Sequence, residues 1–211
     1  MWLLWLEQRP QEKGRTTALL RHFGHQEATP IELTPAPVNL RSRVHDYGGG
    51  VLTGAMEHDR LQLAWVDRGC LWQQSWHLPS GERESPIPLD SPLRLTLPGD
   101  WDLADGLLDL QHQRWIGIRE FAGIDQLVSV QLSTGDQQPQ LLHQPADFAG
   151  YACLSGDGAQ LAWLEWQHPA MPWDSSSLWC AEVGSDGALF NPRKLAGEEG
   201  VSVFQPQWLP D

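Results

Sequence analysis

Hydrophobic and polar side chains alternate along short segments of this chain, and each segment ends at a turn sequence. Residues 161–165 alternate directly after the turn sequence Gly156-Asp157-Gly158. A period of two indicates a strand with one buried face, and Gly-Asp-Gly before such a run indicates a β-hairpin. The same pattern predicts similar strands at residues 2–7, 61–66 and 114–120.

These strands recur at intervals that indicate a repeat. Aligned on Trp5, Trp65, Ile118 and Trp163, the intervals are about 60, 53 and 45 residues. The three tryptophans recur at equivalent strand positions, which predicts that they pack in the core between blades. This is the scale of a four-stranded propeller blade with loops of variable length. Further strands are predicted at residues 71–76, 127–132, 140–143, 178–183 and 193–196. The pattern predicts an all-β fold, a partial β-propeller of about four four-stranded blades that spans residues 1–211 as one unit.

Other segments fit the same picture. Helical spacing is not sustained, and only residues 105–113 would tolerate a helical turn. Residues 82–98 hold four prolines and predict a loop around an edge strand. The chain starts with the pattern of a second strand and stops at residues 205–211 with that of an opening strand. The expectation is therefore a propeller portion truncated at both ends.

Composition narrows the classes of partner. The 12 tryptophans suit half-buried strand surfaces, and a net charge of -13 repels phosphate backbones and anionic lipid. We therefore expect no nucleic acid and no membrane as partner. Three cysteines lie far apart, which favours the cytoplasm as compartment. His22 and His25 lack further ligands nearby, so neither a metal nor a cofactor is expected.

Two strings of residues carry a family resemblance. Residues 38–50 read Val-Asn-Leu-Arg-Ser-Arg-Val-His-Asp-Tyr-Gly-Gly-Gly, and residues 166–174 read Trp-Gln-His-Pro-Ala-Met-Pro-Trp-Asp. Both resemble the N-terminal propeller of the prolyl oligopeptidase family of serine peptidases, in its acylaminoacyl-peptidase and dipeptidyl-aminopeptidase-like branch. Asp46 stands where glutamate is usual. The blade openings at residues 154–158 and 205–211 resemble Ser-Pro-Asp-Gly repeats, which TolB-like propellers also have.

The resemblance implies a function but no catalysis by this chain alone. In that family the propeller covers an α/β-hydrolase domain, restricts entry and thereby selects peptide substrates. Its catalytic serine sits in a Gly-x-Ser-x-Gly elbow, and no serine of this sequence has that context. The implied partners are therefore a hydrolase domain, in cis or in trans, and peptide substrates. Two alternatives stay open: a free-standing propeller that binds a protein or peptide, and a remnant without independent function.

The first candidate site is the string that contains Arg41, Arg43, His45 and Asp46. A guanidinium pair facing the cavity between the two domains would hold a peptide carboxylate or order a loop of the hydrolase domain. In the structural alternative, these groups satisfy one another and the backbone, while residues 48–50, all glycine, permit close approach of another strand.

The second candidate site is the loop that contains His168, Trp173 and Asp174. Two prolines stiffen this loop, so Trp173 would form an aromatic wall for substrate side chains or a contact with the hydrolase domain. A purely structural role for the loop is equally open. Glu165 together with Asp174 would suit a peptide amino terminus, although no motif assigns that role.

Overall fold

Four antiparallel sheets follow one another along the chain in the computed structural model, which describes residues 1–24, 29–81 and 84–210. The first sheet contains β1 (Trp2–Arg9), β2 (Arg15–His22) and β3 (Ile31–Glu32). The second contains β4 (Leu52–Glu57), β5 (Arg60–Asp67), β6 (Cys70–His77), β7 (Ile87–Pro88) and β8 (Leu93–Arg94). The third contains β9 (Trp101–Asp109), β10 (Arg114–Phe121), β11 (Ile124–Gln131) and β12 (Gln140–His143). The fourth contains β13 (Phe148–Leu154), β14 (Gln160–Trp166), β15 (Ser177–Val183) and β16 (Leu189–Ala196).

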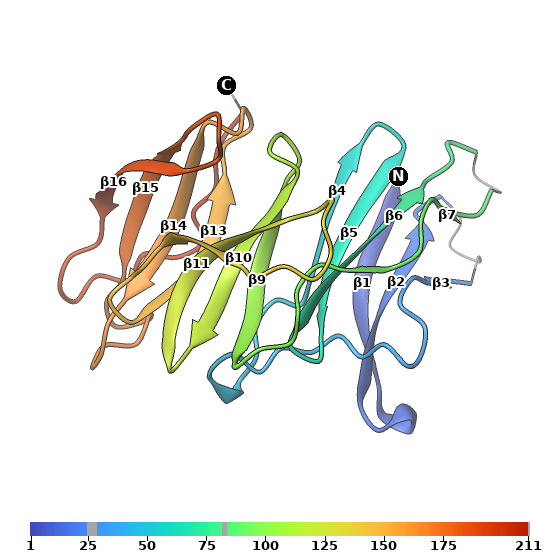
Figure 1. Cartoon of the computed structure of the whole chain (residues 1–211), viewed down its shortest axis with the longest axis horizontal. Helices are drawn as coiled ribbons and strands as arrows, with labels where there is room; N and C mark the ends of the chain where they lie inside the picture. The colour runs from blue at the N-terminus through green and yellow to red at the C-terminus, as the bar shows by residue number, and fades with distance from the viewer. Residues whose placement is uncertain (25–28, 82–83, 211) are drawn as a thin grey trace.

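Strands that follow one another in sequence are also neighbours in each sheet. The order is β1-β2-β3, β4-β5-β6-β7 with β8 also on β6, β12-β11-β10-β9 and β13-β14-β15-β16. Figure 1 shows the four sheets fanned side by side from the first at the right to the fourth at the left. Two short 3-10 turns, Pro10–Glu12 and Val44–Asp46, are the helical elements among the described residues. The predicted all-β class and the partial propeller are therefore confirmed.

Three details differ from the prediction. The first sheet has three strands where four were expected. Residues 105–113, considered for a helical turn, lie largely in β9. The opening strand predicted at residues 205–211 was wrong for its described part, since residues 197–210 form no strand. The physical reason is that no strand of the described residues offers this segment a ladder of hydrogen bonds, and Pro206 and Pro210 lack backbone donors. His25, residues 82–83 and Asp211 lie outside the described residues.

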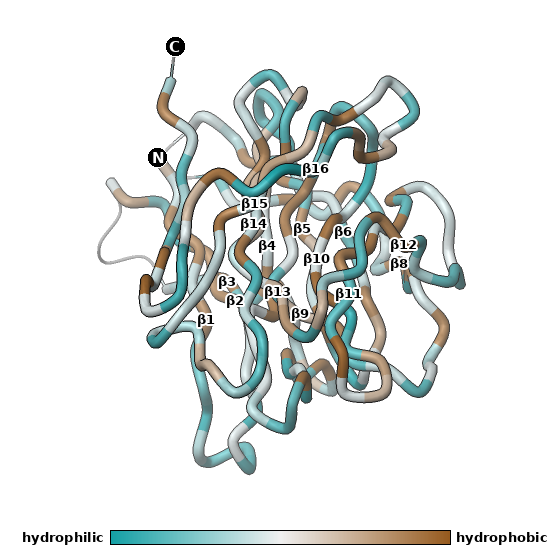
Figure 2. Tube along the Cα trace, turned by 90° about the vertical axis from the view of Figure 1, so that its left-hand side faces the viewer, coloured by the Kyte–Doolittle hydropathy of each residue, from teal (hydrophilic) through white to brown (hydrophobic). Residues whose placement is uncertain are grey.

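Between neighbouring sheets lie three hydrophobic clusters. Trp65 packs between the first and second sheets, Trp115 between the second and third, and Trp163 between the third and fourth. All three are almost fully buried. Figure 2 shows the corresponding hydrophobic stretches (brown) within the strands, whereas the turn that projects lowest is hydrophilic (teal). Alternation along each strand thus places one large apolar side chain in every gap between sheets.

Trp5 departs from this series. The sequence pattern predicted the same packing role for Trp5 as for Trp65 and Trp163, but Trp5 is only half-buried and belongs to none of the three clusters. Its indole instead lies 6.0 Å from the guanidinium carbon of Arg21. The expected burial fails because, among the described residues, no further sheet covers this face of the first sheet. Among the described residues, no helix has the length and apolarity needed to cross a membrane.

Candidate functional site

All seven predicted site residues lie at one end of the sheets. The second strands of the last three sheets finish there, at Asp67, Phe121 and Trp166. This is the lower end in Figure 1, where the Val44–Asp46 turn projects. The loops at this end include the two strings that the sequence singled out. Loops at one end of a propeller converge on a common surface, as binding residues of rigid scaffolds often do.

An open cavity of about 980 Å³ lies at this end and collects basic side chains. Five of the fourteen lysines and arginines of this acidic chain line it. The basic residues are Lys13, Arg15, Arg41, Arg43 and Arg68, and the acidic ones are Glu12, Asp46, Asp67 and Asp102. Burial raises the pKa of Asp67, because the charged form of this carboxyl loses its hydration. The cavity wall is therefore less acidic than the chain as a whole.

Arg41 and Arg43 are both exposed at the cavity, as the first candidate site requires. Within the part of the chain that the structure describes, neither guanidinium group has a hydrogen-bond or ion-pair partner. The backbone holds the segment in place, since Arg41 N donates to Val66 O at 3.1 Å. Two unpaired guanidinium groups beside a cavity are suited to bind a carboxylate through paired hydrogen bonds.

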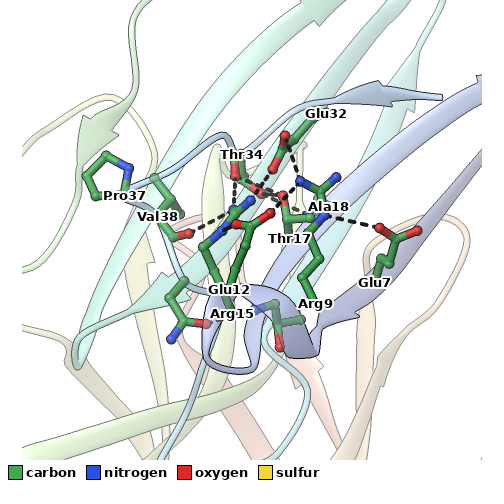
Figure 3. Close-up of polar contacts among 12 residues, drawn as sticks. Glu7, Arg9, Glu12, Arg15, Thr17, Ala18, Glu32, Thr34, Pro37 and Val38 are labelled. Atoms are coloured by element: carbon green, nitrogen blue, oxygen red, sulfur yellow. Dashed lines mark hydrogen bonds and ion pairs between the residues drawn. The ribbon is translucent and has the colours of Figure 1, made fainter. Parts of the chain in front are cut away.

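Arg15 also lines the cavity, and the sequence analysis assigned it no role. Its guanidinium lies 2.6 Å from Glu12 and 2.6 Å from Glu32, and it donates to the backbone oxygens of Thr34 and Val38 (Figure 3). Arg9 contacts the same two carboxylates, at 3.2 and 3.3 Å. In the sequence, the three-residue spacing from Arg9 to Glu12 to Arg15 could have indicated ion pairs among these residues. It could not indicate Glu32, which lies on another strand, β3.

Stability at low pH provides a test of this ion-pair network. Burial disfavours the Glu32 carboxylate, yet hydrogen bonds from Arg15 and Thr17 hold its pKa below the ordinary value of 4.5. A lowered pKa stabilises the folded chain above pH 4.5, and this stabilisation is lost as the pH falls through the lower pKa of the folded state. The melting temperature should therefore fall less steeply below pH 4.5 in Glu32→Gln than in the unmodified chain. Glu57→Gln, at an exposed strand end, should leave the pH profile unchanged.

His45 does not join the arginines at the cavity. The residue adopts a left-handed conformation, with φ 49° and ψ 30°, and its ring points to the third sheet. There Nε2 lies 2.8 Å from Oδ1 of the buried Asp125, and the backbone N donates to Glu120 Oε2 at 3.0 Å. Burial raises the pKa of Asp125, which also accepts a hydrogen bond from the backbone of Ala149. His45 therefore fixes the loop to the neighbouring sheets, and the predicted four-residue cluster is divided.

Phe148 brings the two candidate sites together. The ring of His45 meets the Phe148 ring edge-on at 5.0 Å, and the ring of His168 meets it at 4.9 Å. His168 N also donates to Asp147 Oδ2 at 2.9 Å. The side chain of Phe148 stacks on Trp166 at 5.7 Å. Sequence reasoning missed this aromatic link, since Phe148 begins a strand and carries no motif.

In the loop of the second candidate site, Asp174 and Trp173 have different surroundings. Asp174 closes a turn, because Oδ2 accepts a hydrogen bond from Met171 N at 3.2 Å. Trp173 is 69% exposed, as a wall or contact residue would be.

Glu165, considered for a peptide amino terminus, is instead bound internally, with His143 Nε2 and Trp163 Nε1 each 2.7 Å from Oε1. Tyr47, which the sequence analysis did not single out, is 98% exposed.

The three glycines after Tyr47 permit close approach of another strand. A Cβ on Gly50 would lie 2.8 Å from Asp105 Oδ1, and one on Gly49 would lie 2.7 Å from the Cβ of Ala104. Gly50 N donates to Asp105 Oδ1 at 2.6 Å, and Asp105 N donates to Gly50 O at 2.8 Å. The glycines therefore seat this loop on β9 and leave Arg41 and Arg43 at the cavity.

The comparisons with known proteins agree with the resemblance in the sequence. A puromycin hydrolase variant complexed with PGG is 27% identical with a TM-score of 0.82, over 99% of this chain and 33% of that chain. A puromycin-hydrolyzing peptidase of Mycobacterium tuberculosis is 25% identical with a TM-score of 0.73, over 94% of this chain and 31% of that chain. TolB from Acinetobacter baumannii, at 13% identity and a TM-score of 0.53 over 89% of this chain and 39% of that chain, shares the fold alone.

The matched parts of the puromycin hydrolases are propeller regions of prolyl oligopeptidase-family enzymes, whose chains also include a hydrolase domain. The resemblance to the propeller of this family is confirmed. The chain spans about a third of the length of these enzymes. No protein-family model and no curated protein matches it.

Proposed function

We propose that this chain is the non-catalytic propeller part of a serine peptidase of the prolyl oligopeptidase type. In this role it restricts access to an α/β-hydrolase domain, joined in cis or associated in trans, and selects its peptide substrates. The observation that carries the proposal is the match over 99% of the chain to the propeller of a puromycin hydrolase. The convergence of both candidate sites on one end of the sheets supports it, because a gate needs its contact residues on one surface.

The chemistry of the cavity suits this role. The unpaired guanidinium groups of Arg41 and Arg43 attract the carboxylate of a peptide, and the exposed Trp173 offers a flat apolar surface to its side chains. Neither group performs a covalent step. Their contribution is to bind and orient, so their loss acts on substrate preference and leaves the chemical step to the hydrolase domain.

The test is hydrolysis of aminoacyl, acyl-aminoacyl and dipeptidyl chromogenic substrates by the purified chain, alone and with the product of the adjacent gene. We expect hydrolysis only when both polypeptides are present. Hydrolysis by this chain alone would contradict the proposal, because catalysis would then reside in its own residues. Silence in both samples would favour the second candidate described below.

In the active mixture, replacing Arg41 and Arg43 together by alanine should lower kcat/KM for peptides with a free carboxylate by about tenfold. The reason is the loss of charge-assisted hydrogen bonds to the substrate carboxylate. The change should therefore appear in KM, and it should be absent for the same peptides with an amidated carboxyl terminus. Arg193→Ala, which removes an exposed guanidinium on β16 without altering the cavity, is the matched control. Equal losses on free and amidated peptides would contradict carboxylate recognition.

The second candidate function is a free-standing module that binds a protein or peptide without hydrolysis. Tyr47, 98% exposed, and Trp173, 69% exposed, favour it, since exposed aromatic residues are frequent anchors of protein interfaces. Binding of peptides that persists without any hydrolase activity, and that falls in Tyr47→Ala and Trp173→Ala, would support this candidate over the first.

A further inference from the structure

The cavity at the lower end of the sheets contains unpaired charges of both signs. Its unpaired cations are Lys13, Arg41 and Arg43, and its unpaired carboxylates are Asp46 and Asp102. Among the described residues, none of these five side chains has a hydrogen-bond or ion-pair partner. The other charged side chains that line the cavity are paired, Arg15 with Glu12 and Arg68 with Asp67. Opposite charges attract each other, so their separation within one cavity leaves both signs available to a ligand.

The two signs belong to different parts of the cavity wall. Lys13 lies in the turn between β1 and β2 of the first sheet, and the backbone N of Arg41 donates to the last part of β5 in the second sheet. Asp102 lies on β9 of the third sheet, and Asp46 ends the Val44–Asp46 turn, which packs against β9 and β10. The three sheets follow one another in this order in Figure 1. The wall is therefore positive toward the first two sheets and negative toward the third.

Asp102 is half-buried and lies directly opposite another carboxylate. Its partner in the ladder between β9 and β10 is Glu120. Both oxygens of Glu120 accept backbone hydrogen bonds, from His45 N at 3.0 Å and from Gly123 N at 3.2 Å. Neither oxygen of Asp102 has a donor among the described residues. Like charges directly opposite each other destabilise a sheet, so a cationic group bound at Asp102 would stabilise this position.

Trp101, which precedes Asp102 on β9, adds a hydrogen-bond donor without an acceptor. Trp101 lines the cavity, and its Nε1 is buried without a hydrogen-bond partner among the described residues. Its ring lies over Gly99, where any Cβ would clash with the ring carbons. A buried donor without an acceptor costs free energy, and a backbone carbonyl of a bound peptide is an acceptor that would satisfy it. The cavity thus offers partners to both charged ends of a peptide and to its backbone.

The size of the cavity limits the length of such a peptide. The volume of about 980 Å³ lies within the range of small-molecule sites. A cube of this volume has an edge of about 10 Å, which an extended peptide of about three residues spans at about 3.3–3.6 Å per residue. A shorter peptide does not reach both groups of charges at once, and in a longer one the two ends lie too far apart.

We propose that this cavity binds peptides of about three residues whose two ends are both free. The carboxylate end lies at Arg41 and Arg43 with Lys13 beside them, and the ammonium end lies at Asp102 with Asp46 beside it. The inference rests on the proposed recognition of a peptide carboxylate by the two arginines, and it adds the partner of the amino terminus and a limit on length. Peptides with an acylated amino terminus should therefore be poor ligands of this cavity.

The test is titration calorimetry of the purified chain with trialanine, which needs no hydrolase domain. Acetylating the amino terminus of trialanine and amidating its carboxyl terminus should each raise Kd about tenfold, because each change removes one set of charge-assisted hydrogen bonds. Dialanine and pentaalanine should each bind about tenfold more weakly than trialanine, because only one of their ends is bound at a time. These comparisons use the unmodified chain, so they do not depend on the folding of a variant.

One substitution assigns the ammonium end to its partner. Asp102→Asn should raise the Kd of trialanine about tenfold and leave that of the acetylated peptide unchanged, because the acetylated peptide has no ammonium group to lose. Asp100→Asn is the matched control, since Asp100 is exposed and carries the same charge outside the cavity. An equal loss in Asp100→Asn, or an equal loss for the acetylated peptide, would overturn the assignment.

The outcomes separate this inference from the proposed function. If acetylation leaves Kd unchanged while amidation raises it, the inference is wrong and the recognition of a carboxylate by Arg41 and Arg43 stands. If amidation has no effect, that recognition fails, and the inference fails with it. Affinity that rises with every added residue would overturn the site with two charged ends, and so would a chain that does not bind trialanine.

Discussion

Trp163→Ala should lower the free energy of unfolding by about 3–5 kcal/mol, the loss expected when a large aromatic side chain is removed from a packed core. Trp163 is fully buried at the centre of the cluster between the third and fourth sheets. Its loss leaves a cavity lined by Ile118 and Leu161, side chains held on strands that cannot collapse freely. Glu165 also loses the hydrogen bond from Trp163 Nε1.

Denaturant unfolding at a fixed chain concentration measures this change. Trp173→Ala is the matched control, because Trp173 is 69% exposed and its removal should alter the free energy of unfolding by less than about 0.5 kcal/mol. A loss below about 1 kcal/mol for Trp163→Ala would show that the third and fourth sheets do not depend on this gap for their packing, contrary to the repeat that the sequence predicted.

The strands were predictable because their signal is local. Alternation around Trp65 and Trp163 predicted both the strands and the burial of these side chains, since a period of two decides which face of a strand a residue occupies. The same signal at Trp5 predicted burial wrongly. The pattern shows that one face is apolar, but it does not show whether another sheet lies against that face.

The candidate site was predictable only in part, because side-chain direction within a loop depends on backbone conformation. The left-handed residues His45 and Asp46, with φ 49° and 62°, turn neighbouring side chains to different surfaces. Asp46 therefore lines the cavity while His45 reaches Asp125, 80 residues further along the chain. Neither the turn nor the partner has a pattern in the sequence. Asp125 lies in β11 without a motif around it, and its contact with His45 arises only because the third sheet packs beside this loop.

Asp109→Asn should have the second large effect, a loss of about 3–5 kcal/mol in the free energy of unfolding, because it breaks a buried ion pair. Asp109 is fully buried, and its Oδ2 lies 2.9 Å from Arg114 Nε and 2.8 Å from His112 Nδ1. Removing this carboxylate charge leaves the Arg114 guanidinium, itself only 3% exposed, as an uncompensated buried cation. Its remaining partner is the backbone oxygen of Gly187.

A double variant distinguishes the broken pair from a simple loss of packing. Asp109→Leu with Arg114→Leu removes both charges, so neither partner stays buried alone. The loss of unfolding free energy in this double variant should be smaller than the sum of the losses in Asp109→Leu and Arg114→Leu measured singly. Asp136→Asn removes one partner of the exposed Arg94–Asp136 pair, 38% and 54% exposed, and should leave unfolding unchanged. Additive losses in the double variant would mean that Asp109 and Arg114 stabilise the third sheet independently. The turn between β9 and β10 would then be held by His112 and the backbone rather than by the ion pair.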